Sequence, residues 1–155
     1  MSRTEILSRK QHRKVAVALF NDVWRLLEKT NRTAREELLM IHEAHASRYH
    51  WNVVGTPKNL AIGEWQISRV YAVLGHGEAA KFHANASLEV CRRNGLKDFT
   101  LAYAYEALAR AAAVSRAAGD RERFLHLARR AGAKIRASDD RELFLLRDLA
   151  TIPPV

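Results

Sequence analysis

Apolar residues recur every three or four positions along nearly the whole chain, which is the spacing of one face of an α-helix. In the first such stretch Val15, Leu19, Val23 and Leu26 fall on one side. This pattern predicts helices at about 9–29, 33–52, 57–74, 77–93, 98–118, 120–136 and 139–151. The chain is therefore predicted to be all-α, a single domain over residues 1–155, with a flexible start at 1–8 and a tail at 152–155.

Polar residues and breakers mark the predicted helix ends. Thr33 with Glu36 is typical of a capping box, and Pro57 suits a first helical turn. Asp98 and Asp120 are the predicted N-caps of the fifth and sixth helices. Glycines that favour the end of a helix occur at Leu74-Gly75, Asn94-Gly95 and Ala118-Gly119.

The breaks between paired helices repeat at a fixed interval. Asn31, Gly75 and Gly119 are each 44 residues apart, so the six long helices are predicted to form three hairpins. One hairpin cannot bury both of its apolar faces, and stacking the three would make a common core, with the seventh helix capping the exposed end.

Two segments resemble the tetratricopeptide repeat, in which a helix, a turn and a second helix follow one another. The first is GEWQISRVYAVLGHGEAAKFHANA, residues 63–86, with Tyr71, the Leu74-Gly75 turn and the small residues Ala80 and Ala84. The second is EALARAAAVSRAAGDRERFLHLARRA, residues 106–131, and residues 12–52 resemble a third unit. The resemblance implies a right-handed stack of about three hairpins whose first helices line a concave groove.

The chain also departs from that family. The repeat here is 44 residues against about 34 in the family, Phe124 stands where a closing alanine is expected, and the proline that ends most repeats is missing. The strings HASRYHW and GEWQISRVYAVLG resemble those of uncharacterised bacterial proteins, which implies no known activity.

The family resemblance implies a set of groove-facing residues that could bind a partner: Asn21, Arg25, Trp65, Gln66, Arg69, Arg110 and Arg116. Arginine can bind a carboxylate through two hydrogen bonds, and Trp65 would offer a flat apolar anchor. The expected function is a noncatalytic module that binds an acidic protein or peptide in a basic groove, without a cofactor. The alternative interpretation places Trp65 in the core and leaves the arginines on a solvated face.

Three of the seven histidines lie in HEAHASRYHW, residues 42–51. His42 and His45 share a helix face, and His83 of the next hairpin could add a third metal ligand. His50 is turned away from His45, so one helix cannot present all three to a single ion. Helix packing with a polar network is the preferred interpretation, and a metal- or histidine-dependent enzyme at these four residues is the alternative.

The net charge of +9 is uneven, with +6 over residues 1–35, −2 over 36–90 and +5 over 91–155. Basic ends can attract nucleic acid, acidic peptides or anionic lipid, and a nonspecific nucleic-acid binder is a further alternative, although no recognition motif occurs. No apolar run is long enough to span a membrane, and the lone Cys91 suits a core position in a cytoplasmic protein. The two exposed ends of a short stack could also support a homodimer.

Large apolar residues spaced along the helices define the expected core. They are Leu26, Leu38, Leu39, Ile41, Ile67, Val70, Tyr71, Leu74, Phe82, Leu88, Leu101, Tyr105, Leu108, Phe124, Leu127 and Leu146. The alanine run at 107–113 is expected to allow a close approach of neighbouring helices, so that leucine at Ala109 or Ala112 would overpack the contact.

Overall fold

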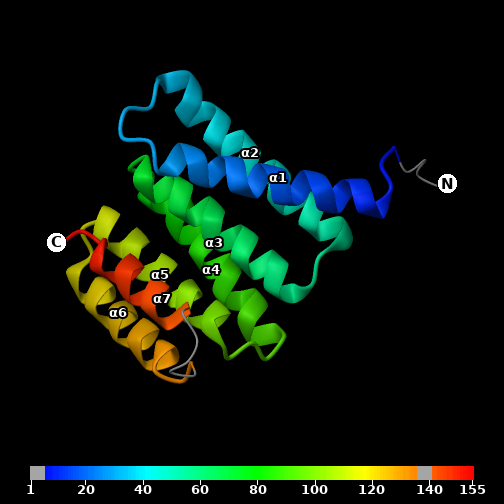
Figure 1. Cartoon of the computed structure of the whole chain (residues 1–155). Coiled ribbons are helices and arrows are strands. Elements are labelled where there is room, and N and C mark those ends of the chain that lie inside the picture. Colours follow the sequence, from blue (N-terminus) through cyan, green and yellow to red (C-terminus); the bar gives the residue numbers. More distant parts are fainter. Residues whose placement is uncertain (1–5, 136–140) are drawn as a thin grey trace.

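The structure is a computed structural model that describes residues 6–135 and 141–155, with the side chains of 141–143 left out. The described residues form seven α-helices and no strand, which confirms the all-α prediction (Figure 1). The helices are α1 Arg9–Leu27, α2 Ala34–Val54, α3 Pro57–Val73, α4 Gly77–Arg93, α5 Phe99–Val114, α6 Ala118–Gly132 and α7 Arg141–Ala150. The predicted cap at Ser138 or Asp139 lies outside the described residues.

Side-chain caps fix the starts of several helices. The Thr33–Glu36 capping box is present at α2, and the Asp98 carboxylate accepts the Thr100 N–H, 2.9 Å away, at α5. Ser8 and Gln11 form a further capping box at α1, at the end of the start that was expected to be flexible, and residues 1–5 of it lie outside the described part. Asp120 is not the cap of α6, because the helix begins earlier and Asp120 lies in its first turn.

Neighbouring helices pack in pairs, α1 with α2, α3 with α4 and α5 with α6. Between pairs, α2 lies against α3, α4 lies against α5, and α3 contacts α5 (Figure 1). The contact between α1 and α3 is smaller. The last helix, α7, packs against α5 and α6 at the end of the molecule away from α1 and α2 (Figure 1).

Buried serines join the helices within the pairs. Ser47 of α2, Ser68 of α3 and Ser87 of α4 each donate a hydrogen bond of 2.8 Å to a backbone carbonyl of the paired helix. The accepting residues are Ala16, Ala80 and Ala61. All six residues are buried, and their small side chains let the helix backbones approach closely enough for these bonds.

A left-handed residue turns the chain at the end of α3, α4 and α5. Gly75 and Gly95 fill this position with φ of 80° and 62°, and Arg116 fills it after α5 with φ of 56°. The predicted break at Gly119 is therefore wrong, since Gly119 lies inside α6, three residues after the turn. Accordingly the second helices begin at residues 34, 77 and 118, which are 43 and 41 residues apart, and the interval of 44 does not hold.

Four residues of the expected core are exposed: Leu38, Leu39, Phe82 and Leu146. In α4 the buried positions are 80, 84, 87, 88 and 91, and Phe82 lies about 200° around the helix from Ala84, with 68% of its surface exposed. In α7 the buried residues are Leu145 and Leu149, so Leu146 points outward. Hydrophobic character alone did not separate the two faces of these helices.

Candidate functional site

Aromatic side chains from the first helix of each pair form a continuous row. In α1, Phe20 and Trp24 are four residues apart and their rings are 6.4 Å apart between centroids. Trp24 is followed by Trp65 of α3 at 5.4 Å, and Trp65 by Tyr103 of α5 at 4.8 Å. Phe99 lies 6.3 Å beyond Tyr103. We call these five residues the aromatic row, and it connects α1, α3 and α5 across one face.

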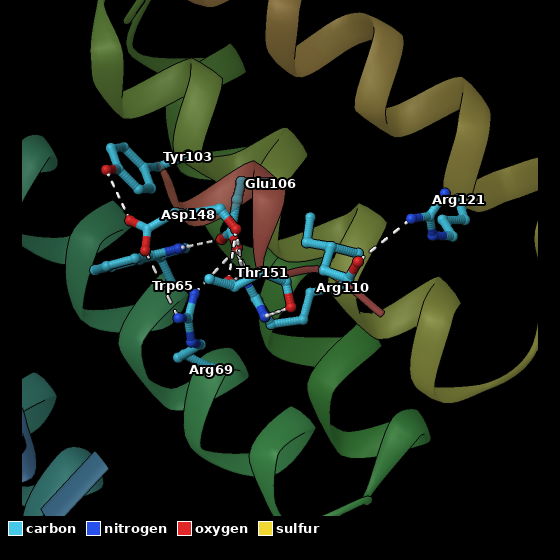
Figure 2. Close-up of polar contacts among 9 residues, drawn as sticks. Trp65, Arg69, Tyr103, Glu106, Arg110, Arg121, Asp148 and Thr151 are labelled. Atoms are coloured by element: carbon cyan, nitrogen blue, oxygen red, sulfur yellow. Dashed lines mark hydrogen bonds and ion pairs between the residues drawn. The ribbon is translucent and has the colours of Figure 1, made fainter. Parts of the chain in front are cut away.

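A carboxylate with no exposed surface lies next to this row. Glu106 of α5 accepts the indole N–H of Trp65 at 2.7 Å, and its other oxygen accepts from Arg69 at 3.1 Å and from Arg110 at 2.8 Å (Figure 2). Glu106 is 0% exposed and Arg110 is 6% exposed. We call Arg69, Glu106 and Arg110 the buried charge cluster.

The C-terminal helix completes the cluster with an acidic residue. The Asp148 carboxylate accepts the hydroxyl of Tyr103 at 2.9 Å and lies 3.6 Å from the Arg69 guanidinium (Figure 2). Arg110 donates to the backbone carbonyl of Asp148 at 2.9 Å and to the Thr151 hydroxyl at 2.8 Å. The last carbonyls of a helix lack partners within it, so the Arg110 guanidinium supplies one to the end of α7.

Burial dominates the electrostatics of this region. It lowers the pKa of Arg69, and the negative charge of Glu106 offsets part of that shift. Burial also raises the pKa of Tyr103, and the neighbouring Asp148 raises it further. The phenol therefore stays protonated and donates a hydrogen bond to Asp148. Each charged group is thus held by an opposite charge or a hydrogen bond, as buried charges require.

The predicted partner-binding residues divide into an exposed set and an interior set. Trp65 and Gln66 are 8% and 1% exposed, and Gln66 donates to the Phe20 carbonyl at 2.9 Å. Residues of the interior set therefore bind other parts of this chain, and Trp65 lies in the core as the alternative interpretation held. The interior set consists of Trp65, Gln66, Arg69 and Arg110.

The exposed set consists of Asn21, Arg25 and Arg116. Arg25 has 64% of its side chain exposed and pairs with Asp22 at 3.4 Å. Arg116 lies in the turn between α5 and α6, beyond the end of the helix on which the aromatic row ends. Of the predicted residues, Asn21 and Arg25 are those that a partner can reach on this face.

Sequence reasoning missed Tyr103, Glu106, Asp148 and Thr151. Glu106 had a recognisable signal, because it is the one acidic residue of α5 and lies four residues before Arg110, with alanines and Leu108 between. Asp148 had no comparable signal, since its partners lie 45 and 79 residues earlier in the chain.

The histidine-rich stretch contributes to a second polar cluster, between α2, α3 and α4. Glu64 is hydrogen bonded to Nδ1 of His83 at 2.7 Å and lies 2.9 Å from the Arg48 guanidinium. His45 is 3.1 Å from the Tyr71 hydroxyl, and the His45 and His83 rings are 5.2 Å apart. The structure thus places His45 next to His83, two of the residues of the histidine alternative.

Two of the four histidines considered as one site do not join this cluster. His42 is exposed, and His50 bonds to His12 of α1, with their Nδ1 atoms 2.8 Å apart. Within residues 6–135 and 141–155, no group of three or more His, Cys, Asp or Glu side chains is arranged to hold a metal ion. His42 and His50 thus lie apart from His45 and His83 in the structure, and the histidine-dependent alternative stays a prediction.

Charge and burial fix the protonation in this cluster. Burial raises the pKa of Glu64, but the hydrogen bond from His83 and the charge of Arg48 outweigh it and hold that pKa below its usual range. Burial lowers the pKa of His45, and the neighbouring His83 lowers it further. At neutral pH the Glu64 carboxylate thus orients His83, and His45 is uncharged. These contacts form a polar network of the kind that the preferred interpretation expected.

A pocket of about 260 Å³ lies elsewhere, between α4, α5 and α6. Its floor includes Leu108 and Ala112, and its rim carries charges of both signs, among them Lys81, Asp120 and Arg123. None of the predicted partner-binding residues lines it.

Neither the comparison with protein-family models nor the searches of curated proteins and of solved structures find a match for this chain. None of the helices in the described part is long and apolar enough to span a membrane. The tetratricopeptide resemblance, the histidine-dependent enzyme and the nucleic-acid binder remain predictions.

Proposed function

We propose that this chain is a noncatalytic interaction module that binds an acidic segment of another protein on the face formed by α1, α3 and α5. This face carries the aromatic row, with exposed Arg25 near one end and the buried charge cluster beside its middle member, Trp65. Flat aromatic surfaces beside arginines are the combination that dominates many protein interfaces. The proposed partner is acidic because three arginines lie beside the row, Arg25, Arg69 and Arg110, and a carboxylate of a partner could replace those of this chain that now pair with them.

One observation carries the proposal. Two of the arginines predicted to hold an acidic partner, Arg69 and Arg110, contact Asp148 of α7 in the chain itself, Arg69 at its carboxylate and Arg110 at its backbone carbonyl. The geometry needed to hold a carboxylate and the carbonyl end of a helix is therefore available on this face. A partner segment with the same chemistry could use the same groups.

The proposal includes the finer architecture implied by the family resemblance. The three helix pairs would stack as tetratricopeptide hairpins do, with α1, α3 and α5 as the layer that lines the concave side. Three facts support this: each second helix packs on the next first helix, α3 contacts both α1 and α5, and the aromatic row crosses all three.

A panel of fluorescein-labelled helical peptides tests the proposed function. All members have leucine at the same positions. The polar positions carry aspartate and glutamate in the acidic members and lysine in the others. Anisotropy titrations are expected to show binding of the acidic members and not of the lysine members. Replacing Arg25→Glu is expected to weaken that binding about tenfold, which corresponds to about 1.4 kcal/mol.

Arg92→Glu is the matched control, because Arg92 is also exposed but lies on α4, which is not one of the three helices of the proposed face. It makes the same change of charge and is expected to leave the affinity within about twofold of wild type. Equal binding of acidic and lysine peptides, or equal losses in the two variants, would contradict the proposed function.

A further inference from the structure

The surface under α7 is built to receive large aliphatic side chains. Leu145, Leu149 and Ile152 of the C-terminal segment are buried, and all three belong to one apolar cluster with alanines of α5 and α6. These alanines are Ala102, Ala109, Ala113, Ala128 and Ala131. A row of alanines makes a shallow trough, and the larger side chains of the opposing helix fill it.

A close backbone contact helps to seat the first of these leucines. A Cβ atom added at Gly132 would lie 2.5 Å from Cδ2 of Leu145, so the absence of a side chain at Gly132 makes room for it. At the other end of the segment, Arg121 of α6 donates to the Pro153 carbonyl at 2.7 Å. The expected tail at 152–155 is thus partly anchored, since Ile152 is buried.

The charges beside the trough select an occupant that places one carboxylate next to Arg69. Arg69, Glu106 and Arg110 together carry a net charge of +1, and Asp148 brings the total to zero. An unbalanced charge in a buried site is strongly unfavourable, so the trough is completed only by a segment that supplies a carboxylate. Arg110 also requires acceptors, which the end of α7 provides through Asp148 O and Thr151 Oγ1.

We propose that α7 is a displaceable intramolecular ligand, which occupies the place where an acidic, leucine-rich helix of the partner protein binds. This inference rests on the proposed function and specifies its partner. The partner helix would carry aliphatic residues at positions i, i+4 and i+7 and an acid at i+3, as Leu145, Leu149, Ile152 and Asp148 do. Its carboxyl end would lie at Arg110.

The length of α7 makes displacement feasible. The helix has ten residues, and isolated helices shorter than about 12–15 residues are marginal in water, so α7 depends on its docking contacts. Its outer face leaves Phe144 and Leu146 exposed, and no other described helix covers them. A tethered segment competes at an effective concentration in the millimolar range, so a partner must bind well to replace it.

Hydrogen exchange on the intact wild-type chain tests whether α7 opens by itself. Amides of residues 145–150 are expected to be protected at least about tenfold less than those of residues 104–113 in α5, because α7 undocks while the helix pairs stay folded. Equal protection of the two helices would mean that α7 opens only with the whole fold, and this would overturn the proposal.

Competition in the full chain tests the binding site itself. The probe is a fluorescein-labelled peptide with the sequence of residues 141–155, titrated by anisotropy. Asp148→Lys places a like charge beside Arg69 and loosens α7, so this variant is expected to bind the probe at least about tenfold more tightly than wild type. Glu28→Lys, an equal charge change at the exposed residue that follows α1, is expected to match wild type.

Leu149→Ala provides a second route to the same state without altering charge, and it is used if Asp148→Lys does not fold. A loosened variant that keeps the protection of α5 but binds the probe no more tightly than wild type overturns the inference. The panel of acidic peptides separates the two ideas. Arg25-dependent binding that neither variant strengthens removes this inference alone, whereas no acidic binding to any variant removes the proposed function and the inference with it.

Discussion

The indole N–H of Trp65 donates to the carboxylate of Glu106 at 2.7 Å, across the contact between α3 and α5. The two residues are 41 positions apart, and each belongs to the first helix of its pair. This bond joins the aromatic row to the buried charge cluster, so packing and charge compensation on this face depend on one another.

Glu106→Gln is expected to destabilise the fold by about 3–5 kcal/mol, since it leaves the buried Arg69 and Arg110 short of one negative charge. Urea denaturation followed by circular dichroism measures the change. Glu89→Gln is the matched control, because the exposed pair of Glu89 with Arg93 on α4 contributes less than about 1 kcal/mol. Similar losses in the two variants would contradict the account of the buried cluster.

Two alanines on α5 are expected to respond differently to leucine. Ala109 is fully buried in the cluster that includes Leu125 and Leu145, so Ala109→Leu should overpack it by about 1–3 kcal/mol. Ala112 lines the pocket of about 260 Å³, which has room for the added carbons, so Ala112→Leu should cost less than about 1 kcal/mol. Thermal unfolding of both variants decides the point, and an equal loss would mean that the pocket cannot hold the side chain.

Arg116→Gly is expected to stabilise the fold by about 1 kcal/mol. The left-handed conformation at φ 56° is unfavourable for arginine and costs nothing at glycine, which fills the corresponding positions 75 and 95. Arg130→Gly, on the exposed side of α6, should instead lose about 1 kcal/mol because its backbone is helical. Chemical denaturation checks both signs, and a loss of stability in Arg116→Gly would contradict the strain assigned to the turn.

Stability is expected to fall as the pH drops below about 6.5, the usual pKa of histidine. The pKa of His45 is lower in the folded chain than in the unfolded chain. Between the folded and the unfolded pKa of His45 the unfolded chain therefore binds more protons, and the free energy of unfolding declines as the pH falls through that range. His45→Gln should flatten the decline between pH 7 and pH 5.5, whereas His126→Gln, at an exposed site on α6, should not. An unchanged slope in His45→Gln would assign the decline to other groups.

Local features of the fold were predictable because their signals lie within a few residues. The Thr33–Glu36 capping box, the Asp98 cap and the left-handed Gly75 each follow from residue types at short spacing. Arg116 shows the limit of this reasoning. The nearest glycine is three residues away, and the packing of α6 against α5, which fixes the length of the turn, outweighs the preference of the turn for glycine.

The candidate site was predictable only in part, because its geometry depends on contacts between distant segments. The family resemblance drew attention to Arg69 and Arg110 as partner-binding residues, but it did not indicate that Glu106 and Asp148 of the chain itself would contact them. The helical pattern grouped four histidines that are near in sequence or on adjacent hairpins, whereas the structure pairs His50 with His12 and leaves His42 exposed. Helical periodicity assigns a face to each residue but does not say which distant side chain lies opposite.

The hydrogen bonds of Arg110 also bear on the order of events during synthesis. Asp148 and Thr151 follow Arg110 by 38 and 41 residues, so a ribosome has completed all three helix pairs before these two acceptors exist, and until then Glu106 is the partner that this guanidinium already has. Until then Arg110 must remain hydrated, since burying it without those acceptors is unfavourable. The nascent third pair therefore stays open at its outer side, and the closing of the interior waits for translation of the final segment.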